Sequence, residues 1–178
     1  MIVESNKKVV YMQAMVLSVV GKDRPGLVED IAKCVNKADG NWLKSSFCHL
    51  SGHFAGFVEV MLPSAQHNAL VQACHALSSL QITLMPASVE SQQDAQELVM
   101  TLTANDRKGI INDISHCLAS LNINITEMET TCESAPNWGN QIFSAKIKLA
   151  APPSLSSDDV KESIEQITDD LVVEFSAS

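Results

Sequence analysis

The sequence predicts an α+β protein with two domains that share the order strand, helix, strand, strand, helix, strand. Three observations predict this fold class. A fifteen-residue segment that begins at Gly21 returns at Ala104, 83 positions later, with six identical residues. A β-rich apolar run precedes each copy, and a helical apolar pattern follows it. Because 83 residues is too long a period for a solenoid repeat, each copy should be a small domain.

The repeat centres on an Asp-Arg-x-Gly turn, at Asp23–Gly26 in the first copy and Asp106–Gly109 in the second. The only two arginines of the chain, Arg24 and Arg107, occupy the same place in the two copies. Aspartate is a good N-cap residue and Pro25 suits a first helical turn, so we expect a helix to begin at each turn. Its apolar stripe should face a sheet. The stripe residues are Leu27, Ile31, Cys34 and Val35, and Ile110, Ile114, Cys117 and Leu118.

The remaining elements follow from alternation, turn residues and caps. Residues 1–12 are expected to be a loose lead-in to the first strand. The expected strands are 14–20, 42–50, 54–62, 82–84, 98–103, 123–131, 141–149 and 171–175. The expected helices are 27–35, one from about Ala65, 108–121, and one capped by Ser156 or Ser157. The predicted domains are residues 13–87 and 97–178, joined by a polar linker at 88–96.

Composition limits the possible functions. The 178 residues carry a net charge of −9 and five cysteines without a Cys-x-x-Cys pair. The charge opposes direct nucleic-acid binding, and the cysteine pattern favours reduced thiols in a cytoplasmic protein. No apolar run approaches the roughly 18 residues of a membrane helix, and no signal peptide is visible, so we expect no membrane association.

The element order with an Asp-Arg-x-Gly turn after the first strand resembles the ACT domain, a ferredoxin-like regulatory fold. Two such units with little else, and the opening Asp23-Arg24-Pro25-Gly26-Leu27, are similar to the glycine cleavage system transcriptional repressor family. The resemblance covers residues 13–178. It implies two ferredoxin-like (βαββαβ) ACT domains in tandem, with antiparallel sheets, helices on one face, and a pseudo-twofold axis between the domains.

ACT domains commonly pair edge to edge and bind a small amino acid near the first strand–helix turn, often with an asparagine at the start of the second strand. The resemblance therefore implies these ligand-binding residues: Asp23, Arg24, Gly26, Asn41, Asp106, Arg107, Gly109 and Asn124. Asn124 matches the pattern better than Asn41. Physically, a glycine admits a close backbone approach, a helix N-terminus favours a carboxylate, and an arginine could pair with it. The structural alternative is that the aspartate caps the helix, the glycine fits a tight turn and the arginine is solvated.

Other candidate sites are weaker. Cys48, His49 and His53 could suggest a metal, but they would have to converge from opposite faces of a hairpin, so we expect no metal and no cofactor. The hairpin tip at 133–140 is longer than its counterpart and carries Trp138. That tryptophan is expected either to anchor a protein partner or to fold over its own domain. No catalytic signature appears, and we do not expect an enzyme.

The resemblance implies a protein that senses a small amino acid, with glycine or serine as candidates. It would modulate transcription indirectly by docking on a DNA-binding transcriptional activator, and a homo-oligomer is compatible with this role. Two alternatives stay open. One is an ACT-type dimerisation module without a ligand. The other is a small ferredoxin-like hydrolase of the acylphosphatase type, although the glycine-rich loop of that family is absent.

Overall fold

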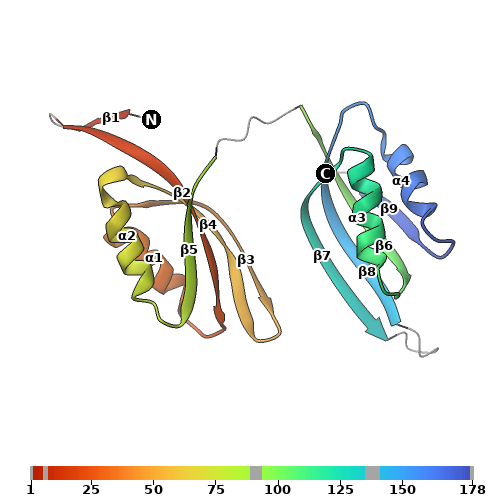
Figure 1. The fold of residues 1–178 in the computed structure, drawn as a ribbon, viewed down its shortest axis with the longest axis horizontal. Coiled ribbons are helices and arrows are strands. Elements are labelled where there is room, and N and C mark those ends of the chain that lie inside the picture. Colours follow the sequence, from red (N-terminus) through yellow and green to blue (C-terminus); the bar gives the residue numbers. More distant parts are fainter. Residues whose placement is uncertain (1, 6–7, 89–93, 135–140, 177–178) are drawn as a thin grey trace. The chain divides into compact units, whose positions relative to one another are not determined.

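The computed structural model describes residues 2–5, 8–88, 94–134 and 141–176. The chain divides into two compact units, Met1–Glu90 and Ser91–Ser178, and each folds around its own antiparallel sheet (Figure 1). Apart from one additional short strand at the start of unit 1, each unit has the order strand, helix, strand, strand, helix, strand. The expected α+β class, with the ferredoxin-like order repeated in tandem, is confirmed.

Unit 1 has the sheet order β3-β4-β2-β5, so the first strand of the domain is central and the last lies at an edge. A two-residue turn with positive φ at Ser51 and Gly52 joins β3 and β4, which is the geometry that matches the twist of a tight hairpin. The elements are β1 (Ile2–Ser5), β2 (Lys8–Lys22), α1 (Leu27–Lys37), β3 (Asn41–Leu50), β4 (His53–Pro63), a 3₁₀ turn (Ser64–Gln66), α2 (His67–His75) and β5 (Leu80–Pro86).

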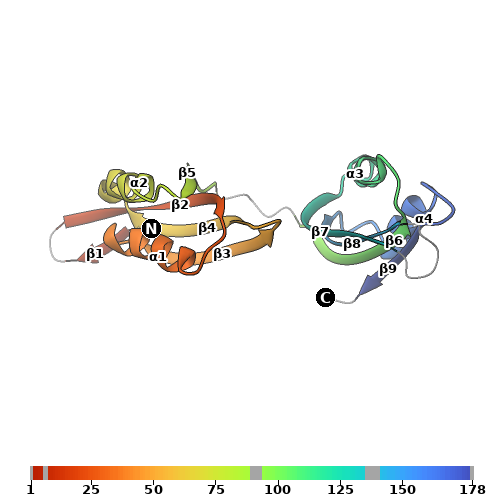
Figure 2. The same cartoon turned by 90° about the horizontal axis from the view of Figure 1, so that it is seen from below.

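The beginning of the chain is strand, and the expectation of a loose lead-in over residues 1–12 is wrong. β2 starts at Lys8, and β1 folds back to pair antiparallel with its first four residues, Lys8–Tyr11 (Figure 2). The sequence Val9-Val10-Tyr11 has strong β propensity. β5 pairs with β2 only from Met15 to Gly21. Residues Lys8–Tyr11 of β2 lie before that region and pair with β1 instead.

Unit 2 repeats the arrangement with the sheet order β7-β8-β6-β9. The repetition extends to a β-bulge. Both second strands shift register at equivalent places, after Trp42 in β3 and after Ile125 in β7. The elements are β6 (Gln96–Asn105), α3 (Ile110–Ser120), β7 (Asn124–Ser134), β8 (Gln141–Ala151), α4 (Ser157–Glu165) and β9 (Val172–Ser176).

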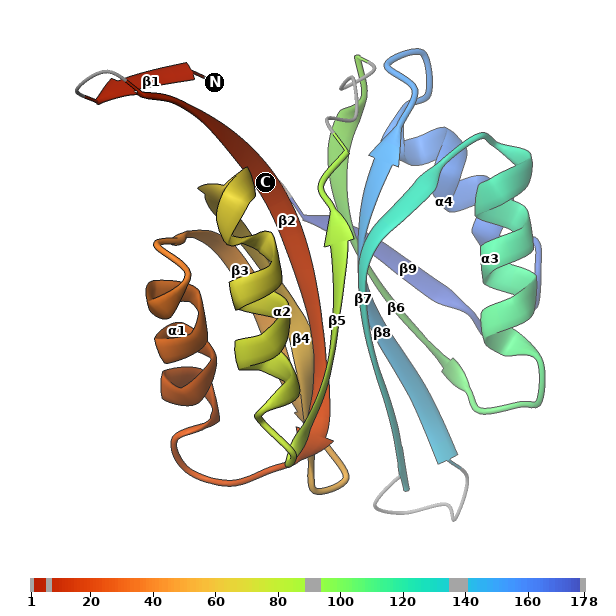
Figure 3. The ribbon, with the colours of Figure 1, turned by 60° about the vertical axis from the view of Figure 1, so that its left-hand side comes forward.

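Two helices cover one face of each sheet (Figure 3), and the core of each unit lies between these layers. The predicted helical stripes are buried there, apart from the half-buried Cys117. The central strands contribute alternate residues, Met15, Leu17 and Val19 in unit 1 and Met100, Leu102 and Ala104 in unit 2. Within the described part of the chain, no helix is long and apolar enough to cross a membrane.

The repeated cysteine joins the two helices of each unit. The Cys34 thiol donates to the Ala73 carbonyl of α2 (3.4 Å), and the Cys117 thiol donates to the Ser163 carbonyl of α4 (3.5 Å). In unit 1 a second buried thiol, Cys74, lies against Cys34. Burial and this neighbour raise the pKa of Cys74 to about 12. The corresponding residue of unit 2 is Ile164, which has no ionisable group.

Gly56 is required by close packing. A Cβ at Gly56 would collide with the Ser46 carbonyl and with Phe47 on the neighbouring strand. The bare backbone of Gly56 leaves room for the Phe47 ring, which stacks on Phe54 with centroids 4.8 Å apart. In unit 2 the corresponding register pair is Thr130 and Ala145.

Candidate functional site

The two repeated turns begin their helices with a glycine. Gly26 and Gly109 are the N-cap residues of α1 and α3, with left-handed φ values of 87° and 88°. The expectation that Asp23 and Asp106 cap these helices is wrong, because each aspartate lies three residues before the cap. Pro25 accordingly precedes the helix. Glycine occupies the cap because other residues adopt this φ only with strain.

A glycine cap leaves the helix N-terminus open. The first intrahelical bonds run from the Asp30 N–H to the Gly26 carbonyl (2.9 Å) and from the Asp113 N–H to the Gly109 carbonyl (3.0 Å). Glycine has no side chain to accept the N–H groups before them. Helix α4 differs, because Ser156 caps it through a reciprocal capping box with Asp159, a carboxylate in the first turn of the helix. The repeated helices thus keep the positive end of the helix dipole available to an anion.

Each arginine is held by its own helix. Arg24 pairs with Asp30, and Arg107 pairs with Asp113, both at 2.7 Å. The hydrogen bond from Arg107 lowers the pKa of Asp113. Arg24 also donates to the Ser79 hydroxyl at 3.3 Å. Neither arginine is simply solvated, yet both side chains remain about two-fifths exposed, so a ligand carboxylate would share the guanidinium with the aspartate.

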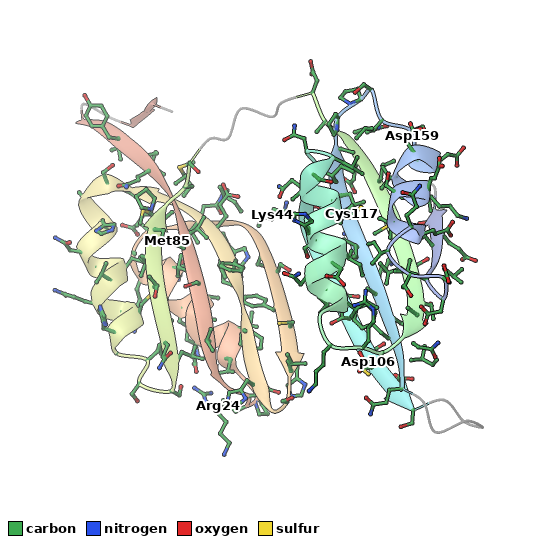
Figure 4. The ribbon with its side chains drawn as sticks, turned by 45° about the vertical axis from the view of Figure 1, so that its right-hand side comes forward. Arg24, Lys44, Met85, Asp106, Cys117 and Asp159 are labelled. Atoms are coloured by element: carbon green, nitrogen blue, oxygen red, sulfur yellow. The ribbon has the colours of Figure 1, made fainter. Side chains whose placement is uncertain are left out.

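The hairpin of each domain closes over the turn. The Asp23 N–H donates to the Gly52 carbonyl (3.0 Å), and the Asp106 N–H donates to the Gln141 carbonyl (2.8 Å). These bonds hold the turns, while the aspartate carboxylates stay exposed. Figure 4 shows Arg24 and Asp106 at these ends of their units.

A second residue faces each turn aspartate, and it differs between the units. His49 places its Nε2 3.6 Å from the Asp23 carboxylate. At the corresponding place, Cys132 lies beside Asp106, and burial together with that carboxylate raises the pKa of its thiol. Sequence reasoning missed both neighbours. The sequence did offer a signal, because His49 and Cys132 are separated by 83 residues, the same offset as the two turns.

The asparagines lie far from the turns of their own units. Asn41 begins β3 and is level with Ala14 of β2 through the intervening β4. The turn at Asp23 comes nine residues after Ala14, which at about 3.3 Å per residue is about 30 Å. Asn124 is level with Glu97 in the same way, again nine residues before its turn. Within one unit, a small ligand therefore cannot touch both the turn and the asparagine.

The other candidates do not assemble into a site. His53 places Nδ1 3.1 Å from the Ser51 carbonyl, and His49 faces Asp23, so the two imidazoles have separate neighbours. The part of the chain that the structure describes holds no cluster of three or more potential metal ligands. Trp138 lies outside the described residues.

Known proteins share the fold described above. Residues 13–84 match the ACT domain family model. The chain is similar to an unknown protein from Galdieria sulphuraria (28% identity, 93% of this chain and 98% of that chain, TM-score 0.81). It is also similar to a proposed glycine cleavage system transcriptional repressor (15% identity, 94% and 99% coverage, TM-score 0.71), a likeness that shows the fold. No curated protein sequence is significantly similar.

Unit 1 therefore carries an ACT domain, and unit 2 repeats the same fold. The resemblance inferred from the repeated turn is confirmed at the level of the domain and of the tandem fold.

Proposed function

We propose that this protein binds a small amino acid at its glycine-capped turns and regulates transcription through a protein partner. The observation that carries the proposal is the repeated combination of an open helix N-terminus, a half-exposed arginine and an exposed aspartate. An amino acid is a zwitterion, and such a turn offers partners to both of its charges. The carboxylate would meet the helix N–H groups and the arginine, and the ammonium group would meet Asp23 or Asp106.

The turn of unit 2 suits this ligand better than the turn of unit 1. Lys108 takes the place of Pro25, and Asn112 takes the place of Glu29. The second turn therefore has one more positive and one fewer negative side chain close to the helix N-terminus. A ligand carboxylate is favoured by both differences.

The charge of the chain supports partner docking rather than DNA contact. The net charge is −9, and each of the two arginines is paired with an aspartate. DNA binding depends on neutralising phosphates with free basic side chains. A regulator with this surface would act on a DNA-binding activator. Glycine is the first candidate ligand because of the resemblance to glycine cleavage repressors, and serine carries the same two charged groups.

Calorimetry with glycine and serine tests the ligand. In Asp106→Asn the ammonium group loses its charged partner, and hydrogen bonds to charged groups contribute about 1.5–3 kcal/mol, so affinity should fall about tenfold or more. Asp23→Asn is the matched change at the other turn, and it should affect the tighter binding site less, because the turn of unit 2 suits the ligand better. Arg107→Ala should also weaken binding. An effect of Asn124→Ala would indicate a site shared between two domains.

The partner is tested by affinity capture of a DNA-binding activator with and without the bound amino acid. A gel-shift assay at physiological salt should show no specific retention of promoter DNA by this protein alone. If about 10 mM glycine or serine gives no heat and no regulator is recovered, the ligand-free dimerisation module would stand instead. Hydrolysis of an acyl phosphate would favour the enzymatic alternative.

A further inference from the structure

The sheet face that carries no helices differs in chemistry between the two units. In unit 1 seven of its thirteen residues are apolar and two are charged, and we refer to it as the unit 1 open face. Register pairing and the burial of the alternate residues define its members. They are Val16, Ser18 and Val20 of β2, Lys44, Ser46 and Cys48 of β3, Ala55, Phe57, Glu59 and Met61 of β4, and Gln81, Thr83 and Met85 of β5.

Large side chains on this face are uncovered. Phe57 is 56% exposed, Val20 46% and Met85 44%, and Figure 4 shows Met85 on β5 and Lys44 on β3. Four strands about 4.8 Å apart, over seven residues of about 3.4 Å each, make a flat area of about 450 Å². The exposed apolar side chains lie within this area, and exposed apolar patches of a few hundred Å² are often functional.

The fold itself does not require such a face, because unit 2 makes the corresponding surface polar. Six charged residues stand there on β7, β8 and β9, and two of them, Lys148 and Glu127, form an ion pair at 2.6 Å. The charged residues are Glu127, Glu129, Glu133, Lys146, Lys148 and Glu174.

We propose that the unit 1 open face is the contact between two copies of this chain, packed sheet against sheet about a twofold axis. Area supports this occupant. Two such faces together would bury about 900 Å² of flat sheet, and more with side-chain relief, close to the roughly 1,000 Å² that a specific interface needs. In a twofold contact the same patch serves both copies, so no second complementary surface is required.

Charge and shape also suit a second copy. The unit 1 open face carries one positive and one negative residue, Lys44 and Glu59, directly opposite each other in the register. It is therefore neutral on a chain whose net charge of −9 otherwise repels a second copy. A twofold rotation can place Lys44 of each copy against Glu59 of the other.

Phe57 protrudes from the middle of the unit 1 open face. Its register neighbours are Ser18 on one side and Ser46 on the other. The phenyl ring therefore stands as a ridge between two small side chains. In an antiparallel or crossed stack, the ridge of one copy fits the serine depressions of the other, at the roughly 10 Å spacing of packed sheets.

Sedimentation equilibrium on the full chain tests the contact. Wild type at about 50 µM should have twice the 19.3 kDa chain mass, and Phe57→Glu should weaken dimerisation at least tenfold. Val172→Glu is the matched control, because Val172 is 57% exposed on the polar open face of unit 2. It should leave the dimer intact. Thermal unfolding of each variant checks that both remain folded.

A mixing experiment tests the twofold directly. Lys44→Glu gives the face two negative charges, and Glu59→Lys gives it two positive charges, so each variant alone should dissociate more readily than wild type. An equimolar mixture should recover the dimer mass, because opposite faces then meet. A monomeric wild type at about 100 µM overturns the proposal, as does dissociation by Val172→Glu but not by Phe57→Glu. Failure of the mixture to recover the dimer mass overturns it as well.

Discussion

The turn of unit 1 is flanked by Pro25 and Glu29, whereas the turn of unit 2 has Lys108 and Asn112 at the same places. The backbones of the two turns are nevertheless alike, with the same left-handed glycine cap and the same arginine–aspartate pair at 2.7 Å. The open sheet faces differ as well, because the face of unit 1 carries two charged residues and the face of unit 2 carries at least six. The two copies share the residues that build the turn and differ in the side chains around it and on the open sheet faces.

The largest expected effect concerns the independence of the two units. Ile31→Ala and Ile114→Ala delete equivalent side chains that are buried in separate cores. Each should lower the free energy of unfolding of its own unit by about 2–5 kcal/mol. Hydrogen exchange read by mass spectrometry should show lost protection in β2 and α1 for the first variant, and in β6 and α3 for the second. Equal loss in both units from either substitution would contradict the independence of the cores.

The next effect concerns the thiol that unit 2 lacks. Because the folded pKa of Cys74 is about 12 against an ordinary 9.0, its thiolate at pH 8 should be roughly a thousandfold scarcer than that of an ordinary cysteine. Iodoacetamide should therefore modify the exposed Cys48 and Cys132 long before Cys74. Rapid alkylation of Cys74 in the folded protein would show that the helices of unit 1 open readily.

The same pKa has a stability consequence. Folding favours the protonated thiol, so this contribution is complete below about pH 9 and is lost as pH rises toward 12. Cys74→Val should remove that part of the alkaline loss from unit 1, measured by urea unfolding at pH 7 and pH 10.

A smaller effect tests the glycine caps. Gly26→Ala and Gly109→Ala place a Cβ at φ values near 88° where no clash occurs, because the nearest atom at Gly26 is 3.8 Å away and Gly109 has none within 4 Å. The cost should therefore be backbone strain alone, about 1–2 kcal/mol in each unit. Asparagine tolerates this region better, so the asparagine variants should lose less. Urea unfolding measures both, and a cost confined to one unit would break the equivalence of the turns.

The smallest effect concerns the arginine–aspartate pair of unit 2. Arg107→Gln removes the hydrogen bond that lowers the pKa of Asp113. The pair is half-exposed, and such pairs contribute little. Because the pKa of Asp113 is lowered, the ionised carboxylate stabilises the fold at pH values above the ordinary pKa of 3.8. This contribution is lost as the pH falls through the pKa of the folded state. The difference in melting temperature between wild type and variant should therefore be larger at pH 7 than at pH 2.

Periodicity predicted the elements because each apolar stripe is a local pattern. Leu27 and Ile31 specify the buried side of α1 without reference to any other part of the chain. The first residues of β2, Lys8–Tyr11, were not predicted as strand because they pair with β1, and no local sequence pattern reveals that pairing. Most other strand ends lie one to three residues beyond their predicted bounds, because pairing extends them past their apolar centres, whereas β7 and β9 begin one residue later than expected.

The candidate site was predictable in part. Repetition identified the turn residues, but the roles of the aspartates depended on contacts. The identical pair Asp30 and Asp113 signalled that each arginine has a partner within its own helix, and that signal was missed. The hairpin closing over each turn, with His49 or Cys132, comes from a segment about 26 residues downstream of Asp23 or Asp106, since 49 − 23 and 132 − 106 both give 26. Tertiary pairing alone brings such segments together.

The packing of Phe47 against Gly56 constrains how the two halves of the chain could have diverged from a common ancestor. Unit 2 has Thr130 in place of Phe47 and Ala145 in place of Gly56, so one side chain is smaller than its counterpart and the other is larger. Alanine at position 56 meets the aromatic ring and also the Ser46 carbonyl, so it becomes acceptable only after the ring is gone and the strands have moved slightly apart. A lineage passing from the unit 1 pair to the unit 2 pair would have to lose the phenylalanine first. In the reverse direction, the glycine must come before the phenylalanine, so the order of the two steps is determined by sterics.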